Sequence, residues 1–289
     1  MSTRRRLLVK SVFTLAMLAL VPAGLAWLLA FEDGRHALRV LRYEWFQGMP
    51  MVWSIPRRIR DCPAMQSSRR LVVLAFGQSN AANSVRGRHR AERGVLNFHA
   101  GRCYAGEDPV PGATGTGGSV WNRLGDLLIA SGRYDSVVLA SIALDSSAIA
   151  QWSPGGDQHP RLLAALEELR AHDLEPTHLL WHQGERDMQL GTDVATYAGH
   201  FSRLVASIRD AGFEAPVHVA LASYCGGRRS EQVRTAQRGV PETVAGVQAG
   251  PDTDVLLGPA LRHDDCHFSA AGAARHAALW RDALLAGAR

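Results

Sequence analysis

One serine, one histidine and one aspartate are placed so that together they could carry out nucleophilic catalysis. Ser79 directly follows the short apolar run Leu71–Phe76, and the glycine at position 77 permits tight backbone geometry there. Asp264 stands three residues before His267, so its carboxylate can reach Nδ1 of the imidazole and leave Nε2 free as a base. Together these groups could carry out nucleophilic attack on a carbonyl carbon. Taken alone, Ser79 is also compatible with a helix N-cap.

A third polar group follows another apolar run, His178–Trp181. It reads His182-Gln183-Gly184-Glu185-Arg186-Asp187, an unusual composition for a segment that only builds a core. The alternative is an ordinary polar loop. The sequence predicts no metal site, because no partner histidine stands at metal-ligand spacing from the Asp-x-x-His group.

Strand-like and helix-like segments alternate after residue 68 and must position these groups. Short continuous apolar runs indicate strands that are buried on both faces. Stretches with helical spacing lie between them. The expected strands are Leu71–Phe76, Val95–Phe98, Val137–Leu144, His178–Trp181, Val217–Ala222 and Val255–Leu257. The expected helices are Val120–Ala130, Arg161–Ala171, Val194–Ala211 and Ala270–Leu285, with Glu231–Ala249 a weaker candidate that Gly239 and Pro241 interrupt.

This alternation predicts an α/β fold: a three-layer α/β/α sandwich with a central parallel sheet. In such a sheet, ligands bind beyond the carboxyl ends of the strands. Ser79 and Gln183 each come just after an expected strand, and His267 lies on a loop before the last expected helix. We therefore expect the three groups to meet at one edge of the sheet.

Together the motifs resemble those of the SGNH hydrolase superfamily. Gly77-Gln78-Ser79-Asn80, Trp181-His182-Gln183-Gly184-Glu185 and Asp264-x-x-His267 are similar to its signature blocks in the branch of sialate O-acetylesterase-like carbohydrate esterases. Residues 115–119 resemble the glycine block of that family, and residues 146–152 resemble its Thr-Ser-Ile-x-x-Trp segment. The glycines expected before that segment are replaced by Asp145-Ser146. The resemblance covers roughly residues 70–285 and implies a flavodoxin-like fold.

The resemblance also implies a role for each matching residue. Ser79 would be the nucleophile, His267 the general base and acid, and Asp264 the carboxylate that orients the imidazole, with Asp265 as a less well spaced rival. The oxyanion hole would consist of the Ser79 N–H, the Gly117 N–H (or that of Gly118) and the Gln183 side-chain amide. Four further residues are expected to support the site or contact the substrate: Gln78, Asn80, Glu185 and Trp152.

The first 67 residues differ in character from the rest of the chain. Arg4, Arg5, Arg6 and Lys10 precede Val12–Phe31, which is twenty residues long and has Thr14 as its only polar side chain. That length matches a bilayer, and the basic flank predicts that the remainder is exported. We expect residues 1–31 to be an uncleaved signal anchor in a bacterial-type inner membrane, with a cleaved signal peptide as the alternative. Residues 32–67 would be a juxtamembrane linker, and residues 68–289 the esterase domain in the periplasm or outside the cell.

Export gives the four cysteines a structural meaning, because disulfides persist outside the cytoplasm. Four cysteines allow three pairings. Cys225 follows an expected strand at its carboxyl end and Cys266 adjoins His267, so we hypothesise a Cys225–Cys266 disulfide that braces the histidine loop. Cys62–Cys103 follows by elimination. The alternative is four reduced, buried cysteines.

Composition and charge limit the remaining functions. The chain has 289 residues, 46% of them hydrophobic, and a net charge of +5 that is carried by scattered arginines. Nucleic-acid binding is not expected, since that function requires a basic face with groove-reading elements. No nucleotide or metal cofactor is implied, and the oligomeric state is left open. The sequence favours a carbohydrate O-acetylesterase; the alternatives are an envelope polysaccharide O-acetyltransferase and a non-catalytic carbohydrate-binding protein.

Overall fold

The computed structural model describes residues 57–63 and 69–286, which fall within a single compact unit spanning residues 55–289. The strands are β1 Ile59–Arg60, β2 Arg70–Gly77, β3 Val95–His99, β4 Arg102–Ala105, β5 Ser136–Ser141, β6 His178–His182, β7 Val217–Leu221 and β8 Val247–Asp252. The helices are η1 Ser79–Ala81, α3 Trp121–Ala130, α4 Ile149–Trp152, α5 His159–Arg170, α6 Glu185–Leu190, α7 Val194–Asp210, α8 Glu231–Thr243 and α9 Ala270–Ala286.

All eight described strands form one sheet in the order β1-β4-β3-β5-β2-β6-β7-β8. The six strands from β3 to β8 along this order pair in parallel, whereas β4 pairs antiparallel with both β3 and β1. Within the parallel part, β5-β2-β6-β7-β8 has the flavodoxin-like order, in which the first strand lies between the second and the third. The chain reverses its direction of travel across the sheet at β2, and such a switch point is where these folds bind ligands.

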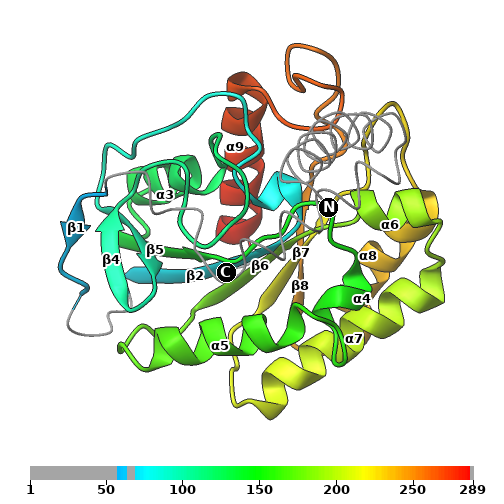
Figure 1. Cartoon of the computed structure of the whole chain (residues 1–289), viewed down its shortest axis with the longest axis horizontal. Helices are drawn as coiled ribbons and strands as arrows, with labels where there is room; N and C mark the ends of the chain where they lie inside the picture. The colour runs from blue at the N-terminus through cyan, green and yellow to red at the C-terminus, as the bar shows by residue number, and fades with distance from the viewer. Residues whose placement is uncertain (1–56, 64–68, 287–289) are drawn as a thin grey trace, which may run out of the picture. The chain divides into compact units, whose positions relative to one another are not determined.

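Helices cover both faces of the sheet. α3 and α9 pack on one face, and α4, α5, α7 and α8 lie on the other (Figure 1). Alternate residues of β2 therefore enter two cores. Leu71, Val73 and Ala75 join the cluster that contains Trp121 and Trp280. On the opposite face, Phe76 contacts Trp152 and Trp181 with ring centroids 5.9 and 4.9 Å away.

The expected three-layer α/β fold is present, with three corrections. The sheet is mixed rather than wholly parallel, because β1 and β4 add an antiparallel edge. The strand expected at Val255–Leu257 is wrong: Val255 and Leu257 are exposed residues outside any strand, and the edge strand is β8. β8 pairs only with β7 and has just two buried residues, so it lacks the apolar run of a central strand. The polar segment after β6 begins a helix, α6, at Glu185.

The expected membrane helix at residues 12–31 and most of the expected linker lie outside the described residues. Among the residues that the structure does describe, no helix has the length and apolar character needed to cross a membrane.

Candidate active site

Ser79 occupies a tight turn at the carboxyl end of β2. Gly77 is the last residue of the strand and pairs with His182 of β6. Its φ is +131°, and a Cβ there would lie 2.1 Å from the backbone oxygen of His182, so only glycine fits without displacement. Ser79 then opens the short helix η1 and is 6% exposed. Its backbone N–H has no acceptor among the described residues, as expected for the first residue of a helix.

Gln78 ties this turn to the start of α6. Its backbone N–H donates to His182 O at 3.1 Å, and its side-chain oxygen accepts from the Arg186 N–H at 3.0 Å. The same oxygen accepts from the Gln183 amide at 3.2 Å. The serine turn and the β6–α6 loop therefore form one hydrogen-bonded unit, and Gln78 supports it from within.

His267 and Asp264 are paired as expected for a catalytic base and its orienting carboxylate. Asp264 Oδ2 lies 2.7 Å from His267 Nδ1, and Asp264 Oδ1 accepts the backbone N–H groups of His267 and Cys266 at 2.6 and 3.1 Å. Partial burial opposes ionisation of Asp264, but these hydrogen bonds outweigh it and hold the pKa of the carboxyl below its ordinary value. The ionised carboxylate fixes the proton on Nδ1 and leaves Nε2 as the basic nitrogen. Asp265, the rival acid, instead accepts from Tyr224 Oη at 2.6 Å.

Asn80 connects the serine turn to the histidine loop. Its side-chain nitrogen donates to Glu185 Oε1 at 2.7 Å and to the backbone oxygen of Cys266 at 3.2 Å. The buried guanidinium of Arg262 donates to the same Cys266 oxygen. Asn80, which directly follows the serine, is thus hydrogen-bonded to the backbone of Cys266, which directly precedes the histidine. No hydrogen bond links Ser79 to His267 among the described residues, and in unliganded sites such bonds are often long.

Glu185 is a buried carboxylate of the site. It is 2% exposed, and Oε2 has no hydrogen-bond partner among the described residues. Burial raises its pKa above the ordinary value, although the hydrogen bond from Asn80 opposes that rise. Because Glu185 touches Asn80 and lies within the protein, its contacts suit it to holding the turn in place.

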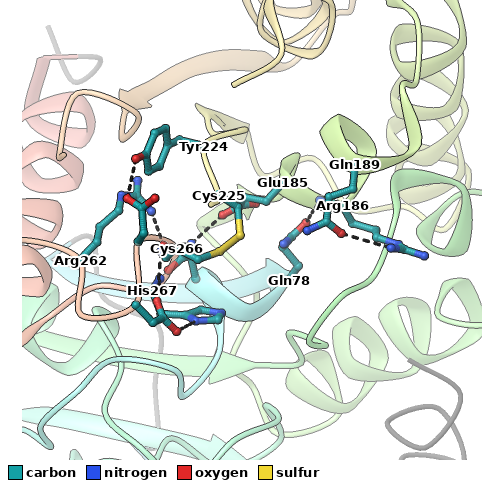
Figure 2. Close-up of a disulfide and its surroundings, with 12 residues drawn as sticks. Gln78, Glu185, Arg186, Gln189, Tyr224, Cys225, Arg262, Cys266 and His267 are labelled. Atoms are coloured by element: carbon teal, nitrogen blue, oxygen red, sulfur yellow. Dashed lines mark hydrogen bonds and ion pairs between the residues drawn. A yellow bond between two sulfur atoms is a disulfide. The ribbon is translucent and has the colours of Figure 1, made fainter. Parts of the chain in front are cut away.

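A disulfide braces the histidine loop (Figure 2). Cys225, on the loop after β7, is bonded to Cys266, which directly precedes His267. The Gly226 N–H donates to Asp265 O at 3.0 Å, and the Tyr224 hydroxyl contacts the side chain of Asp265, so hydrogen bonds flank the covalent link. The second disulfide joins Cys62 and Cys103. Both hypothesised pairings are confirmed, and the alternative of four reduced cysteines is wrong.

Several of the predicted oxyanion donors already have acceptors. The Gly117 N–H donates to Asn83 O at 2.9 Å, and the Gly118 N–H donates to Val85 O at 2.8 Å. The Gln183 amide is fully buried and donates to Asp187 Oδ2 at 2.6 Å and to Ser147 O at 2.9 Å. To act as oxyanion donors, Gly117 and Gln183 would first have to give up these bonds.

A residue that sequence reasoning missed is better placed for this role. Ser146 has a φ of +59°, and its N–H has no acceptor among the described residues. The nearby residues Leu144 and Ser147 both donate to Gly77 O, at 2.9 and 3.3 Å, so Ser146 lies beside the serine turn. The signal was present in the sequence, since Asp145-Ser146 replaces the glycines of the resembled family.

Trp152 can fill only one of its two expected roles. Trp152, expected to support the site or contact substrate, is fully buried and cannot reach a ligand. Its indole N–H donates to Ser147 Oγ at 2.9 Å, so Trp152 supports the loop that follows β5. The Asp264–His267 pair also has an imidazole neighbour, because His263 Nδ1 lies 3.9 Å from Asp264 Oδ2.

Comparison with known proteins places this geometry in a family. A family model described as carbohydrate esterase, sialic acid-specific acetylesterase, matches residues 120–285, which is more than half of the chain. The chain belongs to this family. The match includes Asp264, His267 and the Gln183-Gly184-Glu185 segment, and the serine turn lies before it.

Individual relatives agree with this assignment. A probable carbohydrate esterase of Arabidopsis thaliana is 30% identical over 109 residues, which cover 37% of this chain and 42% of the relative. A crystal structure of an Arabidopsis thaliana protein has a TM-score of 0.58 at 18% identity and covers 76% of this chain and 99% of its own. NanS has a TM-score of 0.53 at 14% identity, covering 76% of this chain and 96% of its own. The two solved structures show a shared fold.

Proposed function

We propose that this chain is a serine esterase that removes O-acetyl groups from carbohydrate. The observation that carries the proposal is the hydrogen bond between the serine turn and the histidine loop: Asn80, which follows the serine, donates to the carbonyl of Cys266, which precedes the histidine. The Asp264–His267 pair at 2.7 Å then supplies an oriented base. Membership of the carbohydrate esterase family supports the choice of an ester on a sugar.

The proposed mechanism uses the serine as a nucleophile. Ser79 Oγ attacks the acetyl carbonyl carbon while His267 Nε2 takes the hydroxyl proton, and Asp264 stabilises the imidazolium that results. The imidazolium then protonates the departing sugar oxygen, which leaves an acetyl-serine. A water molecule, deprotonated by the same nitrogen, releases acetate and restores the hydroxyl.

The negative oxygen of the tetrahedral intermediate needs donors that are free before the reaction. We propose the N–H groups of Ser79 and Ser146, since neither has an acceptor in the part of the chain that the structure describes and the two residues follow the carboxyl ends of neighbouring strands. Helix η1 begins at Ser79, so the Ser79 N–H has no acceptor within that helix. A contribution from Gly117 or Gln183 stays a prediction and requires their present bonds to open.

The test is acetate release from O-acetylated sugars and from p-nitrophenyl acetate by the purified full-length chain. Ser79→Ala should lower the rate to background, while the control Ser202→Ala, a serine bonded within its own helix, should retain it. Labelling of Ser79 by a serine-reactive phosphonate without hydrolysis would instead favour transfer of the acetyl group to another sugar hydroxyl. A folded protein that neither hydrolyses nor labels would contradict the proposal and favour a binding role.

The proposed location is the periplasm or the cell exterior. The two disulfides support an oxidising compartment, because cytosolic thiols are usually kept reduced. Fractionation of cells that produce the full-length chain tests this part, and attachment to membranes distinguishes an anchor from a cleaved signal peptide.

A further inference from the structure

A second imidazole stands beside the Asp264–His267 pair. His263 Nδ1 is 3.9 Å from Asp264 Oδ2, the same oxygen that lies 2.7 Å from His267 Nδ1. The two imidazole rings are nearly parallel, with an interplanar angle of 28° and centroids 6.1 Å apart. Among the described residues, this is the one group of three in which all potential ligand atoms lie within 4.8 Å of one another.

The orientation of His263 favours a cation between it and the carboxylate. Its Nε2 lies 3.3 Å from the backbone oxygen of Ser84, which can only accept, so Nε2 carries the proton in the neutral ring. Nδ1 then presents a lone pair toward Asp264 Oδ2, and two electron-rich atoms face each other. Histidines that bind metals commonly donate their second ring N–H to a carbonyl in this way, and the backbone N–H groups on Asp264 Oδ1 hold the carboxylate as such sites require.

We propose that His263, Asp264 and His267 form a binding site for a divalent transition metal, with Zn²⁺ the best match. Two imidazole nitrogens and one carboxylate oxygen are a frequent zinc donor set, which leaves one position open. Ligand atoms about 2.0–2.1 Å from a tetrahedral ion are about 3.3 Å apart, and the present 2.7 and 3.9 Å separations bracket that value. The side chains are 24%, 43% and 27% exposed, so an ion can enter from solvent.

Metal binding at this site opposes catalysis. A zinc ion bound to His267 Nδ1 displaces the proton that this nitrogen shares with Asp264, and it holds both groups in a geometry set by the metal. His267 then has no ionised partner to stabilise a proton on Nε2. The bound ion is therefore a reversible inhibitor, and this consequence rests on the proposed esterase function. The binding itself does not.

Direct binding is measured first, by competition for Zn²⁺ between the full-length chain and a chromogenic chelator, and by the visible absorption of bound Co²⁺. The wild type should bind one ion per chain. His263→Ala should weaken binding at least 10-fold, because one of three ligands is lost. The matched control is His172→Ala, since His172 is an exposed histidine on another part of the domain. Failure of the wild type to bind, or unchanged binding by His263→Ala, would overturn the proposal.

Inhibition is measured next, with each variant compared to its own rate in a metal chelator. Zn²⁺ should inhibit the wild type and the His172 control, and excess chelator should restore the rate. The inhibition constant of His263→Ala should rise by the same factor as its dissociation constant. Stoichiometric binding with an unchanged rate would refute the inhibitory role. Stoichiometric binding by a chain that shows no hydrolysis under any condition would refute the esterase instead and leave the metal site standing.

Discussion

The buried histidine His218 makes the stability of this domain sensitive to acid. It lies on β7, is 2% exposed, and stacks on His178 of β6 with ring centroids 5.3 Å apart. Neither of its ring nitrogens has a hydrogen-bond partner among the described residues. Burial lowers the pKa of His218 to about 3 and that of His178 to about 4. Both rings are therefore neutral in the folded protein at pH 5.

The direction and size of the effect follow from the unfolded chain. There an imidazole titrates with a pKa of about 6.5, so below that pH the unfolded state binds more protons and the folded state loses stability. Between pH 7 and pH 5 a histidine that stays neutral when folded costs about 1.9 kcal/mol of unfolding free energy. His218→Leu removes that cost. When the pH falls from 7 to 5, the unfolding free energy of the variant should decrease by about 1.9 kcal/mol less than that of the wild type. At pH 7 the variant should be as stable as the wild type or slightly more stable, because the substitution removes a buried polar group that has no hydrogen-bond partner.

The assay is urea unfolding at pH 7 and pH 5, followed by tryptophan fluorescence, for the wild type, His218→Leu and the exposed control His172→Gln. The control should show the wild-type pH dependence. If His218→Leu lost as much stability as the wild type on acidification, the ring of His218 would have to be protonated or solvated in the folded state, and the reasoning from burial would fail.

Three further predictions concern the site. Gly77→Ala should destabilise the domain by about 1–3 kcal/mol and nearly abolish hydrolysis, because φ is +131° and the new Cβ meets His182 O at 2.1 Å; an active variant of normal stability would contradict this. Asn80→Ala should lower kcat by about 10- to 100-fold with little change in KM, since it removes one of the two donors that hold the carbonyl before His267; a change confined to KM would argue against a positioning role. Replacing Cys225 and Cys266 by serine should lower the unfolding free energy by up to about 4 kcal/mol and should also lower kcat. The control is the same replacement at Cys62 and Cys103, which are also 41 residues apart; it should cost similar stability but leave kcat nearly unchanged.

The central strands and long helices were predictable because burial on both faces leaves a clear pattern. β2, β5 and β6 contain continuous apolar runs, β7 is apolar except for His218, and these four strands lie in the middle of the sheet. The edge strand β8 is only partly buried, so its sequence has no continuous apolar run. The sequence therefore predicted a strand at the apolar residues 255–257 instead. The short strands β1 and β4 depend on pairing with each other and on β3, which no local pattern reveals.

The candidate site was predictable where chemistry depends on neighbours in sequence and less so where it depends on packing. The Asp264–His267 contact follows from a spacing of three residues, and the Cys225–Cys266 pairing follows from the strand order. Whether an N–H is free is decided by distant partners, such as the Asn83 carbonyl for Gly117. For the same reason the sequence could not show that Gln183 is fully engaged or that Trp152 is buried.

The position of the Cys225–Cys266 bond also determines how the domain responds to a protease. The exposed segment from Gly226 to Arg229 lies between the two cysteines and contains two consecutive arginines, a target for trypsin-like enzymes. A cut there leaves Ser79 on one fragment and Asp264 with His267 on the other. The disulfide joins these fragments directly beside the histidine, so the nicked domain remains a single covalent molecule until it is reduced. The bond that braces the loop therefore also keeps the two halves of the candidate site together after the backbone between them is broken.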